Sequence, residues 1–212
     1  MNDLRIFSEK LQKILSNPLP GLSAQSLMIP PTRRKQIEAY DQISDVKLSA
    51  VLVLFYANGE NLRFVLIKRA QYEGVHSGQI ALPGGQYEPK DLDLKQTALR
   101  ETGEEIGIDS EKVQVLGSLS PMYIPPSHFK VFPFVGIYPE KPFFHADGTE
   151  TTQIIEVDVN DFLNPECQTE KKVLTRSGDR VPVPCFYLYD HIVWGATAMI
   201  LSELLYLLRK IS

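Results

Sequence analysis

The sequence predicts an α+β fold in which a mixed β-sheet lies between helices, an α/β/α sandwich. Three observations favour this fold: several short strand-like runs, one amphipathic helix in the middle of the chain and a second helix near its end. The 212 residues are enough for one domain with a large core.

The first 45 residues are predicted to form a helix and an irregular arm that pack on a domain of residues 46–212. Apolar side chains recur at helical spacing over residues 4–15, and Asn17-Pro18 ends that helix. Residues 18–31 are rich in Pro, Gly and Ser, which is typical of an irregular segment.

The domain itself is predicted to begin with a β-hairpin. Strand-like runs at 49–56 and 63–69 flank Asn58-Gly59, a pair that favours a tight hairpin turn. A helix follows over 92–106, and Gly107 suits its left-handed C-cap. The remaining elements are strands at 79–82, 113–116, 131–138, 154–159 and 181–189 and a final helix at 194–211.

Charge and composition exclude several classes of protein. A net charge of −4 gives no general attraction to nucleic acid or to an anionic membrane, so a phosphate-bearing partner must be held locally. Cys167 and Cys185 lack the spacing of metal ligands and form no disulfide framework. The longest apolar run, near residues 196–208, is shorter than the ~20 residues that span a bilayer. Charged residues interrupt the N-terminal apolar pattern, unlike a signal peptide. We therefore expect a cytoplasmic protein.

Three carboxylates are concentrated near the end of the central helix. With about 100° of rotation per residue, Glu104 and Glu105 fall about 60° and 40° to either side of Glu101, so the three share one face. Like charges at this spacing destabilise a helix by roughly a few tenths of a kcal/mol per pair. A cation would offset that cost, and oxygen ligands suit Mg²⁺ or Mn²⁺. The alternative is a solvated acidic face in which Arg100 neutralises Glu104.

A glycine pair precedes this helix. Without Cβ atoms, Gly84 and Gly85 permit positive φ angles and let backbone N–H groups approach a phosphate closely. Pro-Gly-Gly is otherwise only a turn. Beside a helix with several carboxylates, it indicates half of a phosphate and metal site.

These residues resemble the motif of the Nudix family, Gly-x5-Glu-x7-Arg-Glu-x-x-Glu-Glu-x-Gly followed by an apolar residue. The matching positions are Gly85, Arg100, Glu101, Glu104, Glu105, Gly107 and Ile108. The loop is one residue longer than in the motif, so its first acid is displaced, or replaced by Asp91 or Asp93. The resemblance implies a Nudix-like sandwich and a metal-dependent pyrophosphohydrolase.

A wider resemblance connects the chain with the coenzyme A pyrophosphatase branch of this family. The segments that carry it are Pro20-Gly21 with Ala24-Gln25 and Met28, Lys68-Arg69-Ala70, His76-Ser77-Gly78-Gln79-Ile80, Leu82-Pro83-Gly84-Gly85, residues 97–102 and residues 194–198. This branch implies hydrolysis of coenzyme A or a derivative to 3′,5′-ADP and 4′-phosphopantetheine or its acyl form. The match at 194–198 is interpreted as structural, the start of a helix packed on the sheet.

The resemblance also implies roles for single residues. Glu101, Glu104 and Glu105, together with Gly85, would ligate Mg²⁺ or Mn²⁺, and a water activated by the metal would attack the diphosphate. Arg100 would orient a helix carboxylate through a bidentate contact. The general base stays open among these glutamates and the loop acids Glu150 and Glu156. The substrate-binding candidates are Lys68, Arg69, His76, Gln79, Gly84 and Gly85.

Each of these interpretations has an alternative. Lys68 and Arg69 also fit an ordinary charged strand end, and His76 and Gln79 also fit local packing. The same hydrolase would serve another diphosphate, such as ADP-ribose, a dinucleotide or an oxidised nucleotide, because residues outside the helix choose the substrate. A sensor domain that binds a nucleotide without cleaving it is a further alternative. The expected partner is a small nucleotide diphosphate, with no nucleic acid and no membrane, and the arm or the terminal helix would suit a homodimer.

Overall fold

The structure, a computed structural model, describes residues 2–31, 46–73, 76–125, 127–174 and 178–211. Its main sheet is mixed: the strand order is β3-β2-β1-β7-β5, with β4 paired to β1, β6 to β7 and β8 to β2. β1 and β7 run parallel, and β1 and β2 run antiparallel. The strands are β1 (Lys47–Asn58), β2 (Asn61–Arg69), β3 (Ile80–Ala81), β4 (Gly84–Gln86), β5 (Gln114–Ser118), β6 (Met122–Ile124), β7 (Phe129–Ile137) and β8 (Thr151–Asp158).

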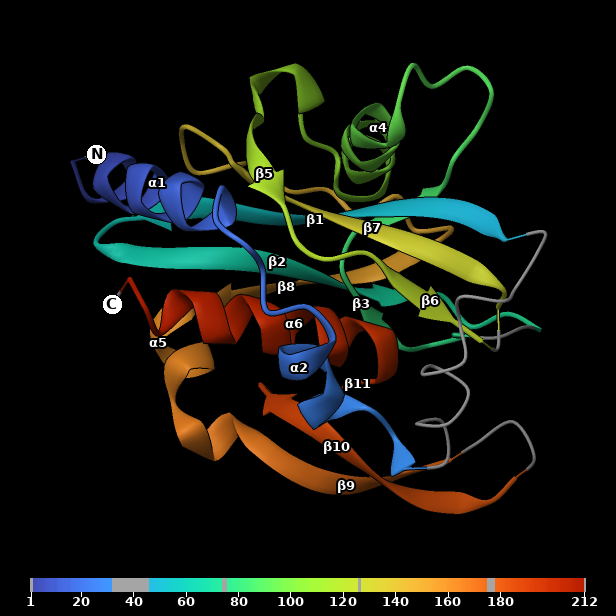
Figure 1. Ribbon diagram of the computed structural model, residues 1–212. Helices are drawn as coiled ribbons and strands as arrows, with labels where there is room; N and C mark the ends of the chain where they lie inside the picture. Colours follow the sequence, from blue (N-terminus) through green and yellow to red (C-terminus); the bar gives the residue numbers. More distant parts are fainter. Residues whose placement is uncertain (1, 32–45, 74–75, 126, 175–177, 212) are drawn as a thin grey trace.

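Helices cover both faces of this sheet (Figure 1). α4 (Leu94–Ile106) lies on one face and α6 (Gly195–Leu208) on the other. Side chains of β1 alternate between the two layers: Leu52 and Leu54 join the apolar cluster beneath α4, and Val53 and Phe55 join the cluster that contains α6. The predicted α+β class, with an α/β/α sandwich and a mixed sheet, is confirmed.

A second, antiparallel sheet lies beyond α6 (Figure 1). It has the order β11-β10-β9, with β9 (Gln168–Leu174), β10 (Arg180–Leu188) and β11 (His191–Trp194). Because α6 is covered from both sides, ten of its residues are buried, which explains an apolar pattern that runs around the helix. β9 and β11 were not predicted from the sequence. β9 is an edge strand in which Glu170, Lys171 and Lys172 replace the apolar alternation of a buried strand.

The local sequence predicted the bounds of the first hairpin and of the central helix to within a few residues. Asn58 pairs with Asn61 across the β1–β2 turn, and Gly59 has φ 65°. α4 begins two residues later than predicted because Asp93 is its N-cap and accepts a hydrogen bond from the backbone N–H of Gln96. Gly107 ends the helix in the left-handed region, with φ 71°.

The N-terminal segment packs against both the sheet and α6. α1 (Asn2–Leu15) contacts β5, and the arm after it contains α2 (Leu22–Gln25) and the 3-10 turn η1 (Ser26–Met28). The expectation of an irregular arm over 18–31 is therefore wrong in part, because α2 gains contacts with α6 that the local sequence does not reveal. Residues 32–45 of the predicted arm lie outside the described residues. The short helical elements not yet named are η4 (Ser110–Lys112), α5 (Val159–Leu163) and η5 (Pro165–Cys167).

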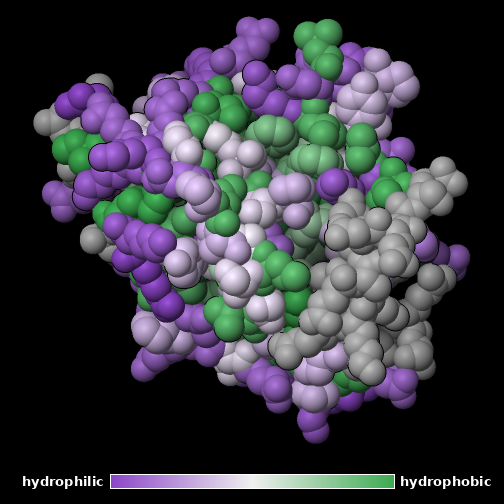
Figure 2. Space-filling model, viewed as in Figure 1, coloured by the Kyte–Doolittle hydropathy of each residue, from purple (hydrophilic) through white to green (hydrophobic). Residues whose placement is uncertain are grey.

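The arm leaves some apolar surface exposed. Figure 2 shows apolar surface where α2 and η1 lie, and Leu22 and Leu27 are the large apolar side chains exposed there. Of the helices that the structure describes, none is both long and apolar enough to cross a membrane.

Candidate active site

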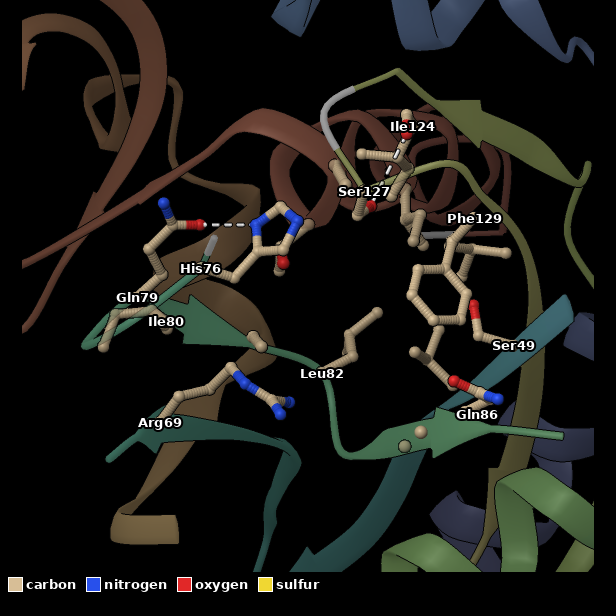
Figure 3. Close-up of a pocket in the computed structure, with 18 of the residues that line it drawn as sticks. Ser49, Arg69, His76, Gln79, Ile80, Leu82, Gln86, Ile124, Ser127 and Phe129 are labelled. Atoms are coloured by element: carbon tan, nitrogen blue, oxygen red, sulfur yellow. Dashed lines mark hydrogen bonds between the residues drawn. The ribbon is translucent and has the colours of Figure 1, made fainter. Parts of the chain in front are cut away.

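One cavity, of about 540 Å³, collects residues from the main sheet and from both of its covering helices. Six of the sequence-predicted site residues line it: Arg69, His76, Gln79, Gly84, Gly85 and Glu101. In Figure 3, Arg69 and the His76–Gln79 pair lie on one side, Phe129, Ser49 and Gln86 lie on the other, and Leu82 lies between them. Arg69, Glu101 and Glu150, whose charges all act on Glu105, form the polar end of the cavity, and much of the remaining lining is apolar.

The glycine pair lets α4 approach the sheet closely. A Cβ at Gly84 would lie 2.3 Å from the carbonyl oxygen of Ala50, and its φ is 143°. A Cβ at Gly85 would lie 2.4 Å from the carboxyl carbon of Glu101. The sequence analysis assigned the N–H groups of this pair to a phosphate. The structure gives the Gly84 N–H a different acceptor, Oε2 of Glu105 at 2.8 Å.

Glu101 and Glu105 are the two helix carboxylates that this approach buries. Their side chains are 14% and 3% exposed. Burial raises the pKa of Glu101. Burial also raises the pKa of Glu105 to about 8, against the opposing effects of the Gly84 N–H and the Arg69 charge. Both groups thus hold negative charge at a cost that a nearby cation would relieve.

Glu104 does not join this pair. Its side chain is 58% exposed, and its Oε2 accepts a hydrogen bond from Nη1 of Arg100 at 3.0 Å. Helical spacing brought the three glutamates to one side of the helix, but it does not fix the direction of each side chain. For Glu104, the structure therefore shows the alternative arrangement, in which Arg100 neutralises this carboxylate.

Arg100 has a different main partner from the predicted one. Its bidentate contact is with Asp91, from Nε to Oδ1 at 2.8 Å and from Nη2 to Oδ2 at 3.1 Å, and not with a helix carboxylate. Nη2 also lies 2.9 Å from Oε1 of Glu101. Arg100 therefore connects the loop before α4 to two of the helix glutamates.

The two candidate loop acids have separate roles. Asp93 caps α4, whereas Asp91 is 4% exposed and accepts hydrogen bonds from Arg100, the Glu88 N–H and the Thr97 hydroxyl. The hydrogen bond from Arg100 holds the pKa of Asp91 well below its usual range. The additional loop residue thus leaves an acid buried against the motif arginine.

Replacement of Asp91 by asparagine is expected to destabilise the protein by roughly 3 kcal/mol at pH 7, because Arg100 loses a buried partner. The folded-state pKa of Asp91 is depressed, so its contribution is complete above the ordinary pKa of 3.8 and is lost as pH falls through the folded-state value. The difference in unfolding free energy between the wild type and Asp91→Asn should therefore become smaller below about pH 4. Urea unfolding at pH 7 and pH 3 measures this difference.

The matched control is Asp93→Asn, since asparagine is also a good N-cap and little stability should be lost. Equal destabilisation by the two variants would contradict the role given to the Asp91–Arg100 pair.

Lys68 and Arg69 are the last two residues of β2, where its pairing with β8 shifts register, and their side chains have different neighbours. Arg69 lines the cavity, and its Nη1 lies 3.7 Å from Oε1 of Glu105. Lys68 lies toward β11, where burial, with the Lys68 charge nearby, lowers the pKa of His191. The expectation that both cations face the same site is corrected: the structure brings only Arg69 to it.

His76 and Gln79 form a hydrogen-bonded pair at the cavity. Nδ1 of His76 lies 3.0 Å from Oε1 of Gln79, and His76 has φ 70° (Figure 3). The Arg69 N–H donates to the carbonyl oxygen of Gln79 at 3.0 Å, which fixes the loop on the end of β2. Local packing and contact with a ligand are thus compatible for this pair.

A divalent metal fits the residues at the polar end. Oε1 of Glu105 is buried and receives no hydrogen bond from the residues that the structure describes. Oxygen donors next to a diphosphate-sized space suit Mg²⁺ or Mn²⁺. Within the same residues, no group of three Asp, Glu, His or Cys side chains is arranged to hold a metal ion. Joint ligation by the three helix glutamates therefore requires Glu104 to leave Arg100.

Two further residues line the cavity: Glu150, which the sequence offered as a candidate general base, and Trp194, which was not assigned to the site. Glu150, which precedes β8, lines the cavity, and its charge raises the pKa of Glu101 and Glu105 further, in addition to the effect of their burial. Trp194, at the end of β11, also lines it. The signals were present, because Glu150 had been considered as a base and 194–198 had been matched, but that match was interpreted as structural only.

A glycine-lined strand, buried helix carboxylates and an arginine around one cavity are features expected of a hydrolase of phosphoric anhydrides. Residues 46–176 match the NUDIX domain family. The chain is 32% identical over 178 residues to an uncharacterized Nudix hydrolase NudL of Photorhabdus laumondii, covering 84% of this chain and 90% of that protein. It is 34% identical over 140 residues to an uncharacterized NudL of Yersinia enterocolitica, covering 66% of this chain and 71% of that protein.

The chain therefore belongs to the Nudix family and is a pyrophosphohydrolase that acts on a nucleoside diphosphate derivative. Enzymes of this family generally use divalent metal ions. The fold is also similar to a solved Nudix hydrolase from M. smegmatis, RenU, with a TM-score of 0.50 at 16% identity, covering 80% of this chain and 90% of that one.

Proposed function

We propose that the protein hydrolyses the diphosphate of coenzyme A or a derivative, giving 3′,5′-ADP and 4′-phosphopantetheine or its acyl form. The observation that carries the proposal is the division of the cavity. The charged residues that line it are Arg69, Glu101 and Glu150, at the polar end, and much of the remaining lining is apolar. The sequence segments that resemble the coenzyme A pyrophosphatase branch support the same choice.

Coenzyme A matches this division better than the alternatives do. One side of its diphosphate carries a nucleotide, and the other carries a long uncharged arm that ends in a thiol or thioester. ADP-ribose and dinucleotides carry polar sugars on both sides, and their hydroxyl groups would lose water against apolar side chains without gaining hydrogen bonds. An apolar lining with a few convergent polar groups is typical of sites that take an amphipathic ligand.

The polar end supplies the groups for the reaction. We assign the metal to Glu101, Glu104, Glu105 and the backbone of Gly85, as Mg²⁺ or Mn²⁺. When bound, such an ion neutralises the diphosphate and acidifies water. Arg69, which lies beside Glu105, is suited to hold a phosphate oxygen, and His76 and Gln79 are suited to donate hydrogen bonds to a second one.

Arg100 acts as a positioning residue in this proposal. Held by Asp91, it fixes the carboxylate of Glu101 against Gly85. The proton of the attacking water is taken by a carboxylate at the polar end. Glu150 is one candidate because it lines the cavity. Glu156 is a weaker one, because its Oε2 already accepts a hydrogen bond from the Tyr56 hydroxyl.

The test is a panel of diphosphates assayed with Mg²⁺ or Mn²⁺ and with identification of the products. We expect kcat/KM for coenzyme A or an acyl derivative to exceed that for ADP-ribose and dinucleotides by about tenfold or more, since the uncharged arm adds contacts. A tenfold preference for ADP-ribose or a dinucleotide would reject the substrate. Tight binding without turnover of any diphosphate would favour a nucleotide sensor.

A further inference from the structure

Part of the cavity is built by a segment that the family match does not include. The match ends at residue 176, yet Trp194, Ala196, Thr197 and Ile200 line the same cavity as Glu101 and Arg69. These four residues, at the end of β11 and on the first turns of α6, are called the C-terminal wall here. The catalytic helix and the glycine pair belong to residues 46–176, so the wall lies in the part of the chain that follows the family match.

Three of the four wall residues are apolar, and Thr197 adds one hydroxyl. Apolar side chains from the main sheet and the segments beside it extend the wall's apolar surface: Leu82, Ile124, Phe129 and Val131. The charged lining residues come instead from β2, α4 and the loop before β8. A ligand group at the wall is therefore held by exclusion of water and by dispersion contacts, not by charge.

Glu203 fixes the helix that carries the wall. Its side chain is fully buried one turn beyond Ile200, and its two oxygens accept four hydrogen bonds. The donors are the Ser120 N–H at 3.1 Å, the Ser120 hydroxyl at 2.6 Å, the Gly21 N–H at 3.1 Å and the Gln25 side-chain amide at 2.9 Å. The adjacent Ser202 hydroxyl donates to the carbonyl oxygen of Ala24 at 2.7 Å.

This arrangement fixes α6 from two directions. Ser120 belongs to the segment between β5 and β6, and Gly21 and Gln25 belong to the arm. A buried carboxylate is costly unless its oxygens are satisfied, and these four donors satisfy them. The wall therefore has a fixed position, as a surface that discriminates between ligands requires.

We propose that the C-terminal wall binds the uncharged arm of the substrate, the group attached to the phosphate that does not carry the nucleoside. We also propose that Glu203 is a positioning residue for this wall. The proposal rests on the proposed diphosphate hydrolysis and deepens it, because it names the part of the substrate that the wall selects. It does not require that the arm be pantetheine. Any unbranched, uncharged chain of similar length meets the same contacts.

The test uses ADP β-alkyl esters with methyl, butyl and octyl chains, which differ only in the arm. In the wild type, kcat/KM should rise roughly two- to fourfold per added methylene until the wall is covered. Trp194→Ala should lower kcat/KM for the octyl ester about tenfold more than for the methyl ester. Tyr206→Ala, an exposed aromatic on the same helix, is the matched control and should leave this ratio unchanged.

Glu203→Gln tests the positioning role. The glutamine side chain has one acceptor oxygen in place of two, so at least one donor loses its partner. We expect KM for the octyl ester to rise about tenfold while kcat changes little, since α4 and the glycine pair are untouched. If this variant does not fold, Ser120→Ala, which removes one of the four hydrogen bonds, is expected to raise the same KM by a smaller factor.

Two results would overturn the inference. One is a wild-type kcat/KM that does not depend on alkyl length. The other is a Trp194→Ala variant that loses discrimination between ADP and UDP esters but keeps the chain-length dependence, which would assign the wall to the base. A rise with chain length but no preference for coenzyme A in the diphosphate panel would reject the coenzyme A proposal alone. A preference for coenzyme A with flat alkyl dependence would reject the wall alone.

Discussion

Replacing Glu105 with glutamine is expected to lower kcat/KM by about a thousandfold or more and, at the same time, to stabilise the metal-free protein at alkaline pH. The loss of activity follows from removal of a charged ligand at the polar end of the cavity. The gain in stability follows from burial: the side chain is 3% exposed, and its pKa is raised to about 8. Glutamine keeps an acceptor for the Gly84 N–H without the cost of a buried charge.

The pH dependence has a definite direction. The folded-state pKa of Glu105 lies above the ordinary value of 4.5, so the folded protein binds this proton more tightly than the unfolded chain does. Its contribution to stability is complete below pH 4.5 and is lost as pH rises through about 8. Relative to wild type, Glu105→Gln should therefore gain on the order of 2 kcal/mol between pH 5 and pH 9.

Urea unfolding in a chelating buffer at both pH values measures this gain. Addition of Mg²⁺ or Mn²⁺ should raise the stability of the wild type more than that of the variant, because only the wild type keeps all three carboxylate ligands. A variant that retains activity, or that is less stable than wild type at pH 9, would contradict the assignment of Glu105.

Gly85→Ala is expected to reduce kcat/KM about a hundredfold while the protein stays folded. The new Cβ would lie 2.4 Å from the carboxyl carbon of Glu101, so this flexible side chain has to move. Displacement of a reacting or ligating group by about 1 Å is enough for a loss of this size. Steady-state kinetics and a thermal unfolding curve separate the two effects.

Gly84→Ala is the informative comparison, because its Cβ meets backbone. The carbonyl oxygen of Ala50 would lie 2.3 Å away, and the φ of 143° is strained for any other residue. We expect Gly84→Ala to lower the free energy of unfolding by roughly 3 kcal/mol or more. If Gly85→Ala kept full activity, the contact between Gly85 and Glu101 would have no part in catalysis.

The parts of the fold that the sequence predicted well are those with local causes. Asn58-Gly59 sets the first hairpin through its own turn geometry, and Asp93 and Gly107 bound α4 through caps. β9 and β11 were missed because their formation depends on pairing with β10 and on cover from α6. α2 was missed for the same reason: its stabilising contacts are with a helix about 180 residues later in the chain.

The same distinction applies to the candidate site. Helical periodicity brought Glu101, Glu104 and Glu105 to one side of α4, and the Nudix resemblance identified the glycine pair and Arg100. Periodicity carries no information about Asp91, whose buried contact with Arg100 joins the loop to the helix. Nor does it reveal that the cavity is lined by Arg69 and not by its neighbour Lys68, or that Trp194 of the second sheet reaches it.

The hydrogen bonds of Glu203 join the arm and the terminal helix into one cooperative unit. Release of the arm would strand a carboxylate in the interior with half of its donors gone, so partial detachment is costly. The amide protons of Gly21 and Ser120, about a hundred positions apart, both bond to this one side chain, so we expect displacement of α6 to open both of them to exchange with solvent.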